Sequence, residues 1–263
     1  MNGWLDELGR ALDASPREVA FFFRDDDGGW DDRRLAALLD LFARRSLPLD
    51  VAAIPCAVTP ALAAQLRARI DDAPDRVAVH QHGFAHLNYE TEGRKCEFGD
   101  ARPRALQRQD IVLGRRLLAD MHGLPAGDIF TPPWNRCTAT TGESLRAAGF
   151  RVLSRDATAK PLNVEGLYEL PVTVDWFARR KGVRLNPAEV GAQLARAAES
   201  AAPVGVMLHH ALMDDEEMRR ADELLRLLAA HANARCSLMS ALAPESFPAA
   251  ARPEGSGARP AAV

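Results

Sequence analysis

Short apolar runs alternate along the chain with longer segments in which hydrophobic residues recur at every third or fourth position. The apolar runs predict buried strands, and the periodic segments predict amphipathic helices. Strands are expected at residues 19–23, 49–54, 77–79, 128–130, 151–154, 167–174, 204–208 and 235–238. Helices are expected at residues 31–45, 60–71, 103–122, 140–148, 187–201 and 214–232.

This alternation indicates an α/β protein with a parallel sheet. Strands that are separated by helices pair in parallel through right-handed crossover connections. Seven or eight such units in a chain of 263 residues favour a single-domain parallel (β/α) barrel over an open sheet. In a barrel of this kind, the functional groups are expected at the carboxyl ends of the strands.

The two ends of the chain depart from the alternating pattern. Residues 1–16 predict a short amphipathic helix that packs on the barrel, because Leu5, Leu8 and Leu12 share one face. The barrel itself is assigned to residues 17–248. Residues 249–263 are small, aperiodic and rich in proline and glycine, which predicts a disordered tail.

Composition and charge narrow the possible partners. The net charge is −3 and no basic block is present, so nucleic acid is not expected as a partner. The chain begins with neither a secretion signal nor an apolar run of membrane-spanning length, which predicts a cytoplasmic protein without membrane insertion. The four cysteines show no CxxC spacing, which favours free thiols. The oligomeric state is not indicated.

Three consecutive acids, Asp25, Asp26 and Asp27, follow the first predicted strand and precede two glycines. Crowded carboxylates repel one another, and a protein tolerates them mainly where a cation or a proton is shared. The alternative is a solvated loop whose acids cap the following helix.

Histidines gather at two other strand ends. His80, His82 and His86 lie within seven positions, which favours a metal site over a structural role. His82 and His86 have the spacing of one helical turn, whereas His80 and His82 would share one face of a strand. His209 and His210 end a late strand, where a histidine suits general acid catalysis or a buried hydrogen bond to the backbone.

Tryptophans accompany these polar groups. Trp30 follows the acids, Trp134 lies in a proline-rich loop, and Trp176 follows Asp175 at another strand end. Aromatic rings beside polar groups suit a sugar-like ligand, although they also serve as plain packing. Asp175 is either a functional acid or a helix cap.

Taken in order, these segments resemble one family. The chain presents Asp-Asp-Gly, His-x-x-x-His, a Pro-aromatic loop, Asp-Trp and Leu-His between Phe21 and His210. This order is similar to that of the polysaccharide deacetylases, metal-dependent carbohydrate esterases that include chitooligosaccharide deacetylases. The resemblance implies an irregular parallel (β/α) barrel that removes an N-acyl group, usually acetyl, from a small or oligomeric carbohydrate by hydrolysing a non-peptide C–N bond.

The resemblance also implies roles for the early motifs. Asp26 corresponds to the general base, while Asp27, His82 and His86 correspond to the metal ligands. Zinc suits these ligands best, and cobalt, nickel or manganese are alternatives.

The later motifs correspond to substrate contacts and the acid. Pro133 and Trp134 would line the groove, and a backbone N–H there would bind the oxyanion. His209 corresponds to the general acid, Asp175 to the residue that keeps it protonated, and Trp176 to a wall of the pocket.

The chain departs from the family pattern at two positions. Gly83 stands where the family usually has Ser or Thr, which removes a hydrogen bond that would stiffen the loop. Thr131 stands about where the family has an arginine that holds the base, and Arg136 or Arg24 is the candidate replacement.

Several alternatives remain open from the sequence. Asp25 is an alternative base, His210 an alternative acid and His80 an alternative ligand. Some relatives with the family's fold open cyclic amides and ureides. Two histidines and one carboxylate also form the metal site of non-haem iron oxygenases, although these usually use a double-stranded β barrel. A binding domain that has lost catalysis is the third class.

Overall fold

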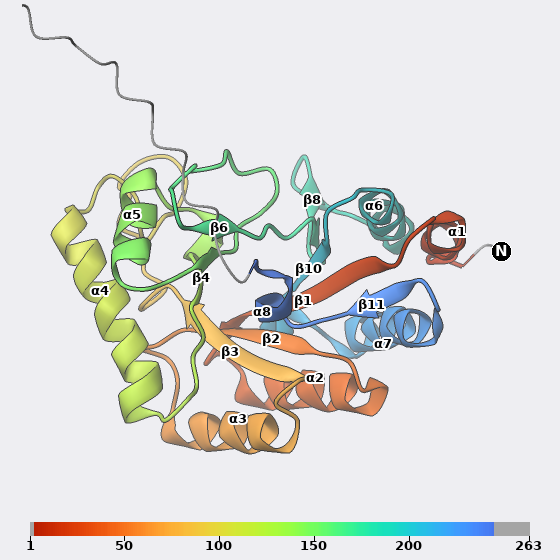
Figure 1. The fold of residues 1–263 in the computed structure, drawn as a ribbon, viewed down its shortest axis with the longest axis horizontal. Coiled ribbons are helices and arrows are strands. Elements are labelled where there is room, and N and C mark those ends of the chain that lie inside the picture. The colour runs from red at the N-terminus through yellow and green to blue at the C-terminus, as the bar shows by residue number, and fades with distance from the viewer. Residues whose placement is uncertain (1–2, 245–263) are drawn as a thin grey trace, which may run out of the picture.

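Nine strands form one parallel sheet in the computed structural model, which describes residues 3–244 (Figure 1). The hydrogen-bonded order is β6-β5-β4-β3-β2-β1-β10-β7, and β11 adds to β1. The strands are β1 (Val19–Gly28), β2 (Leu49–Ala53), β3 (Val77–His82), β4 (Ile129–Thr131), β5 (Val152–Leu153), β6 (Tyr168–Glu169), β7 (Val174–Asp175), β10 (Val204–Leu208) and β11 (Ala234–Cys236).

The two edge strands of this order belong to one continuous segment. The Leu170 N–H donates to Leu153 O on the β5 side at 3.0 Å, whereas the Thr173 N–H donates to Gly205 O on β10 at 2.8 Å. Residues 168–175 therefore join β5 to β10 and close the sheet on itself. The prediction of an irregular parallel (β/α) barrel in a single α/β domain is confirmed.

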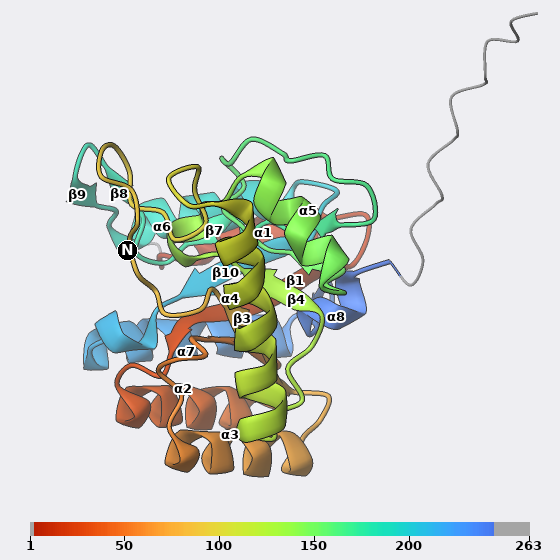
Figure 2. The ribbon, with the colours of Figure 1, turned by 90° about the vertical axis from the view of Figure 1, so that its left-hand side faces the viewer.

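Helices cover the outside of the curled sheet. They are α1 (Asp6–Ala14), α2 (Asp32–Arg45), α3 (Pro60–Asp72), α4 (Arg104–Arg116), α5 (Ala139–Ala147), α6 (Pro187–Ala198) and α7 (Asp215–Ala230), whereas the short α8 (Met239–Leu242) lies at one end of the barrel. The helices α2 and α3 run along the same side of the barrel (Figures 1 and 2). None of the described helices is long and apolar enough to cross a membrane.

The sequence pattern located these elements with few differences. Beyond its carboxyl end, α4 continues as a π-helix over Leu117–Met121. The antiparallel hairpin of β8 (Arg179–Arg180) and β9 (Val183–Arg184) was not predicted, because its two-residue strands carry no apolar alternation. Leu8 and Leu12 bury one face of α1, as predicted. The predicted tail and the boundary at residue 248 lie outside the described residues.

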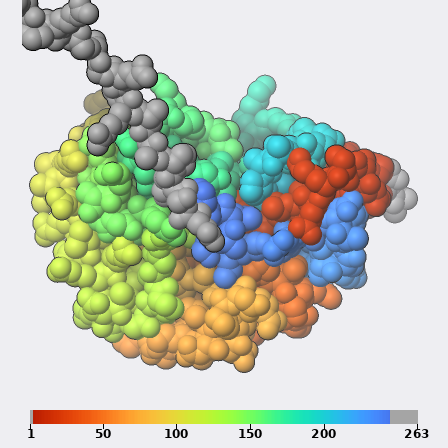
Figure 3. Space-filling view, viewed as in Figure 1, coloured from red at the N-terminus to blue at the C-terminus, as the bar shows by residue number. Residues whose placement is uncertain are grey.

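The inside of the barrel changes from apolar to polar along its axis. Phe22, Val172 and Met207 pack against the buried Met239 of α8 at one end. Figure 3 shows α8, in blue, at the centre of this face of the molecule. Arg24 and Asp26 follow Phe22 at two-residue spacing on β1, so they lie on the same strand face, further toward the carboxyl ends.

Candidate active site

The strand β1 continues through the three acids and ends at Gly28, five residues beyond its predicted end at Phe23. The pairing of β1 with β2 shifts register between Asp25 and Gly28, and Asp27 has a φ of 67°. A strict strand would send consecutive side chains to opposite faces. The bulge and the left-handed backbone at Asp27 instead allow Asp26 and Asp27 to line the same cavity.

Each of the first two acids has its own cation. Asp26 accepts two hydrogen bonds from the buried Arg24 guanidinium, at 2.7 and 2.9 Å. Asp25 lies 2.6 Å from Nδ1 of His210 and also accepts the His210 backbone N–H at 2.9 Å. This pairing explains how a buried strand tolerates adjacent carboxylates, because a buried charge needs a partner that satisfies it.

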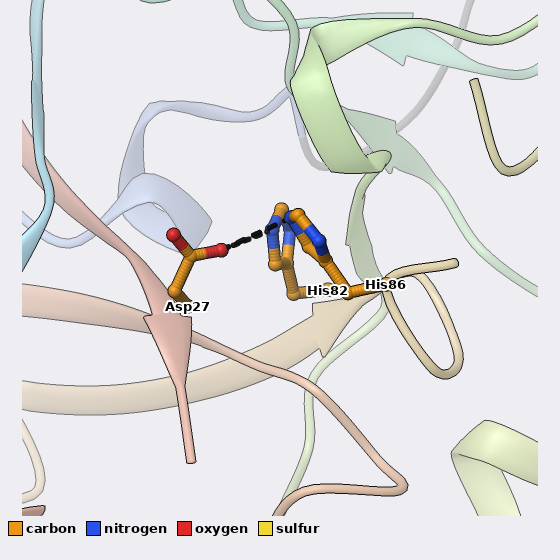
Figure 4. Close-up of side chains that lie close together, drawn as sticks. All are labelled: Asp27, His82 and His86. Carbon is orange, nitrogen blue, oxygen red and sulfur yellow. Dashed lines mark hydrogen bonds and ion pairs between the residues drawn. The ribbon is translucent and has the colours of Figure 1, made fainter. Parts of the chain in front are cut away.

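The third acid, Asp27, meets two histidines (Figure 4). Its Oδ1 lies 3.2 Å from Nε2 of His82 and 3.2 Å from Nε2 of His86. One ligand atom from each of the three residues lies within 4.8 Å of the others, so the group could hold a metal ion. The helical turn predicted for His82 and His86 was wrong: His82 ends β3, and His86 lies in a loop with a φ of 56°.

The hydrogen bonds around His82 fit a metal ligand. Nδ1 of His82 lies 3.1 Å from the Thr131 carbonyl oxygen, which can only accept, so this nitrogen carries a proton. In the neutral ring, Nε2 then presents a lone pair to the Asp27 carboxylate. Two facing lone pairs require a shared proton or a metal cation between them. Although burial opposes the charged ring, Asp27 raises the pKa of His82 above its usual value.

Of the two candidate replacements for the missing motif arginine, Arg24 is the one that contacts Asp26. Besides Asp26, it donates to Oγ of Ser154 and to Oδ1 of Asn135, each at 2.8 Å. Burial would raise the pKa of the Asp26 carboxyl, but the Arg24 charge holds this pKa below its usual range. The other candidate, Arg136, donates to the Lys95 carbonyl at 2.9 Å and does not contact Asp26.

A cavity of about 510 Å³ joins these groups. Its lining includes Asp26, Asp27, His82, His86 and His209, together with two tryptophans. The His86 ring lies between Trp30, at 4.7 Å between ring centroids, and Trp134, at 4.5 Å. Trp134 has a φ of 56°, so the left-handed backbone of the Pro133–Asn135 turn presents it here. The cavity therefore combines a group that could hold a cation, a separate carboxylate and two aromatic walls.

His209 reaches this cavity, but Asp175 does not hold it by a hydrogen bond. Oδ1 of Asp175 accepts the Phe177 N–H at 2.8 Å, and Nδ1 of His209 is buried without a hydrogen-bond partner among residues 3–244. Burial raises the pKa of Asp175 above its usual range, against the Phe177 N–H and the nearby His209 charge. Any influence of Asp175 on His209 therefore acts through space.

Solved structures share this architecture. A polysaccharide-deacetylase-like protein from Mycobacterium smegmatis superposes with a TM-score of 0.66 at 17% identity, over 92% of this chain and 96% of that one. The chain has the polysaccharide deacetylase fold. A family 4 acetyl xylan esterase from Clostridium thermocellum, in complex with cobalt, gives 0.54 at 14% identity over 85% and 89%.

The polysaccharide deacetylase fold also includes an inactive protein. A carbohydrate esterase family 4 pseudoenzyme from Bacillus anthracis gives a TM-score of 0.55 at 11% identity, over 86% of this chain and 66% of that one. No protein-family model and no curated protein matches the sequence. The likeness at these identities is one of fold, so the reaction must be argued from the side chains.

Three residues singled out from the sequence lie away from the cavity of this polysaccharide deacetylase fold. Trp176 is buried, donates to Glu217 at 2.6 Å and packs against Trp4, so it belongs to the core and forms no pocket wall. Pro133 is buried and does not line the cavity. His80 lies 2.9 Å from Oγ1 of Thr131, and burial lowers its pKa to about 3.

The alternative acid and base form a separate buried pair. Burial opposes the charged His210 ring, but the Asp25 carboxylate raises its pKa to about 9. The other ring nitrogen of His210 bonds the Trp30 carbonyl, and neither Asp25 nor His210 lines the cavity. This geometry favours Asp26 and His209 for roles at the cavity.

Glu97 was not anticipated from the sequence, and it holds the loop that carries His86. The carboxylate is fully buried and accepts the backbone N–H groups of Phe84, Ala85 and Leu87, at 3.1, 2.8 and 3.3 Å. Gly83 makes room for it, because a Cβ there would lie 2.2 Å from Glu97 Oε2. Glu97 thus stiffens the loop in which the polysaccharide deacetylase pattern usually has Ser or Thr.

We expect Glu97→Gln to weaken divalent-metal binding by about 10- to 100-fold, the usual cost of losing support behind a metal ligand. The amide removes the charge and one of the two oxygens that accept the three backbone N–H groups. Metal affinity is measured by competition with a chromogenic chelator. The matched control is Glu92→Gln in the exposed part of the same loop. Equal affinities for the wild-type and Glu97→Gln proteins would contradict the prediction.

Proposed function

We propose that the chain is a metal-dependent hydrolase that removes an acyl group from the nitrogen of a carbohydrate-like substrate. One observation carries this proposal: the Asp27, His82 and His86 cluster shares its cavity with a separate carboxylate, Asp26, that is held by an arginine. A cluster that served only as a structural metal site would not need a second ionised acid beside an open cavity.

Each residue of the cavity has a separate role in the proposed reaction. A divalent ion held by Asp27, His82 and His86 would supply Lewis acidity toward the acyl carbonyl and the attacking water. Asp26, kept ionised by Arg24, accepts the proton of that water. The Trp134 backbone N–H would bind the developing oxyanion, and His209 protonates the leaving nitrogen. The amide C–N bond breaks, and the products are a carboxylic acid and an amine.

The cavity walls support a sugar-like substrate. Trp30 and Trp134 flank the cluster, and aromatic rings of this kind bind the apolar faces of sugars while polar groups fix their orientation. Structural neighbours include proteins named as deacetylases and acetyl xylan esterases. Cyclic amides and ureides are the alternative substrates, since the same groups would open them by attack at a carbonyl.

The parallel barrel argues against the oxygenase alternative, because two-histidine, one-carboxylate iron sites usually lie on double-stranded β barrels. An inactive binding domain is opposed by the Arg24–Asp26 pair, which restores the support that Thr131 cannot provide. The oxygenase alternative predicts bound iron and oxygen consumption, whereas the inactive binding domain predicts no turnover.

The first experiment measures bound metal by mass spectrometry, for the protein purified without added metal and after reconstitution. About one equivalent of zinc, cobalt, nickel or manganese is expected in the wild type. We expect the His82→Ala/His86→Ala double variant to lose it. The reconstituted protein is then tested for release of acetate from N-acetylated sugars and for opening of cyclic ureides.

His80→Ala is the matched control, since His80 lies on the same strand but outside the cavity. Absence of metal from the reconstituted wild type would contradict the mechanism. Stoichiometric iron with oxygen consumption would favour the oxygenase.

A further inference from the structure

A second cavity, of about 450 Å³, adjoins the active-site cavity. Trp134 and Asn135 line both cavities, so the two form one groove that bends around this turn. Asp175 and Met207 also line the second cavity. A substrate that places its amide at the metal cluster can therefore extend past Trp134.

Four cations line this groove: Arg94, Lys95, Arg136 and Arg179. Arg94 and Lys95 come from the loop after β3, Arg136 from the turn after β4, and Arg179 from the hairpin strand β8. Nζ of Lys95 lies 5.9 Å from the Trp134 ring centroid. Segments that are distant in sequence thus bring positive charge to one groove.

These cations lack carboxylate partners within residues 3–244. None forms an ion pair, although Arg136 donates to the Lys95 carbonyl and Arg179 to the Gly182 carbonyl. Burial and the nearby Arg94 charge lower the pKa of Arg136. Uncompensated like charges raise the free energy of the empty groove, and an anionic ligand relieves this cost.

The two acids of the second cavity, Asp156 and Asp175, accept hydrogen bonds from neighbouring backbone N–H groups. Oδ1 of Asp156 accepts the Thr158 N–H at 2.7 Å, and Oδ1 of Asp175 accepts the Phe177 N–H at 2.8 Å. The second cavity alone is lined by three arginines and these two carboxylates, which leaves it with one excess positive charge, in a protein whose overall charge is −3. The part of the groove beyond Trp134 therefore differs in sign from the molecule as a whole.

We infer that the groove binds an N-acylated saccharide that carries an anionic group, a phosphate or a carboxylate, beyond the amide to be hydrolysed. This inference rests on the proposed hydrolase function and narrows its substrate class. Trp134 packs against the sugar, and the arginines contact the anion through charge-assisted hydrogen bonds. Neutral sugars bind the same cavity without this contribution.

The test compares probes that share one N-acetylated sugar: N-acetylglucosamine, its 1-phosphate, its 6-phosphate and the corresponding 6-carboxylate. We expect at least one anionic probe to exceed the neutral sugar in kcat/KM by about tenfold or more, mainly through KM. The advantage falls steeply at 0.5 M salt, a concentration chosen because it screens exposed charges over roughly 4 Å. A preference for phosphate or for carboxylate identifies the anion.

Neighbouring arginines provide a matched pair of variants. Arg179 lines the groove, whereas Arg180 pairs with Glu189 at 2.8 Å outside it. Arg94→Ala/Arg179→Ala is expected to lower the ratio of anionic to neutral kcat/KM by about tenfold, and Arg180→Ala to leave it unchanged. An unchanged ratio in the double variant, or faster hydrolysis of the neutral sugar by the wild type, would overturn the inference.

A binding measurement that does not depend on turnover tests this inference apart from the proposed function. Calorimetry of the four probes is performed with metal-loaded Asp26→Asn protein, which is expected not to consume them. If the wild type hydrolyses no probe but anionic probes bind in an Arg94- and Arg179-dependent manner, the groove assignment stands and the hydrolase proposal fails. If no anionic probe binds more tightly than N-acetylglucosamine, the groove assignment fails.

Discussion

Asparagine in place of Asp26 is expected to lower turnover by roughly 10²- to 10⁴-fold, the usual contribution of a general base. Metal content is expected to stay near one equivalent, because Asp26 is bonded to Arg24 and is not part of the ligand cluster. The amide is nearly isosteric but cannot accept a proton from water. The loss should therefore fall on kcat, with little change in KM.

Asp27→Asn is the comparison, since the neighbouring side chain belongs to the ligand cluster. We expect Asp27→Asn to lose both metal and turnover, whereas Asp26→Asn loses turnover alone. Metal content by mass spectrometry and acetate release at saturating substrate distinguish the two variants. Full activity in Asp26→Asn would exclude this residue as the base, and loss of metal would show that it helps to hold the ion.

The second large effect concerns Asp50, a carboxyl buried inside the barrel on β2. Its Oδ2 accepts the Met239 N–H of α8 at 2.9 Å, while Oδ1 has no hydrogen-bond partner among the described residues. Burial raises the pKa of Asp50 from 3.8 to about 7, although the Met239 N–H opposes the shift. The folded protein therefore holds Asp50 neutral at pH values where the unfolded chain ionises it.

The pKa of Asp50 is higher in the folded protein than in the unfolded chain, so protonation of Asp50 favours the folded state. This stabilisation is complete below pH 3.8 and is lost as pH rises to about 7. The full shift corresponds to about 4 kcal/mol. Asparagine keeps an acceptor for the Met239 N–H without ionising. We expect Asp50→Asn to be more stable than the wild type, by a margin that grows from pH 4 to pH 7 and then levels off.

Urea unfolding of both proteins between pH 4 and pH 8.5 measures this margin. The exposed Asp71→Asn variant is the control, and surface changes of this kind alter stability by less than about 0.5 kcal/mol. A constant difference between Asp50→Asn and the wild type across this range would contradict the assigned pKa. A lower stability at pH 8 would show that the ionised carboxylate has a partner.

The sequence predicted the barrel because periodicity and alternation are local signals, and the strands and helices follow them closely. The resemblance grouped Asp27, His82 and His86 as metal ligands, and the structure places these three side chains close together. The helical turn predicted for His82 and His86 is absent, because His82 ends β3 and His86 lies in a loop. A glycine with a φ of 57° and a buried carboxylate shape that loop instead.

Features that depend on contacts between distant segments could not be predicted from the sequence. Glu97 lies in a charged stretch that reads as a solvent-exposed loop, and only the path of the chain places it beneath the His86 loop. The resemblance implied that Trp176 is a pocket wall, but this side chain packs against Trp4 and donates to Glu217 in the core. Arg24 could be named only as one of two candidates, since its partners Asn135 and Ser154 are more than a hundred positions away.

The three-way pairing of β1 has a consequence for how the chain is made. This strand bonds to β2, to β10 and to β11, and about 175 residues separate Gly28 from Val204 at the start of β10. A ribosome needs roughly 10 to 40 seconds to synthesise that length. Throughout that time the apolar stretch Phe21, Phe22 and Phe23 has an open edge, so the nascent protein depends on protection from aggregation until its last strands emerge.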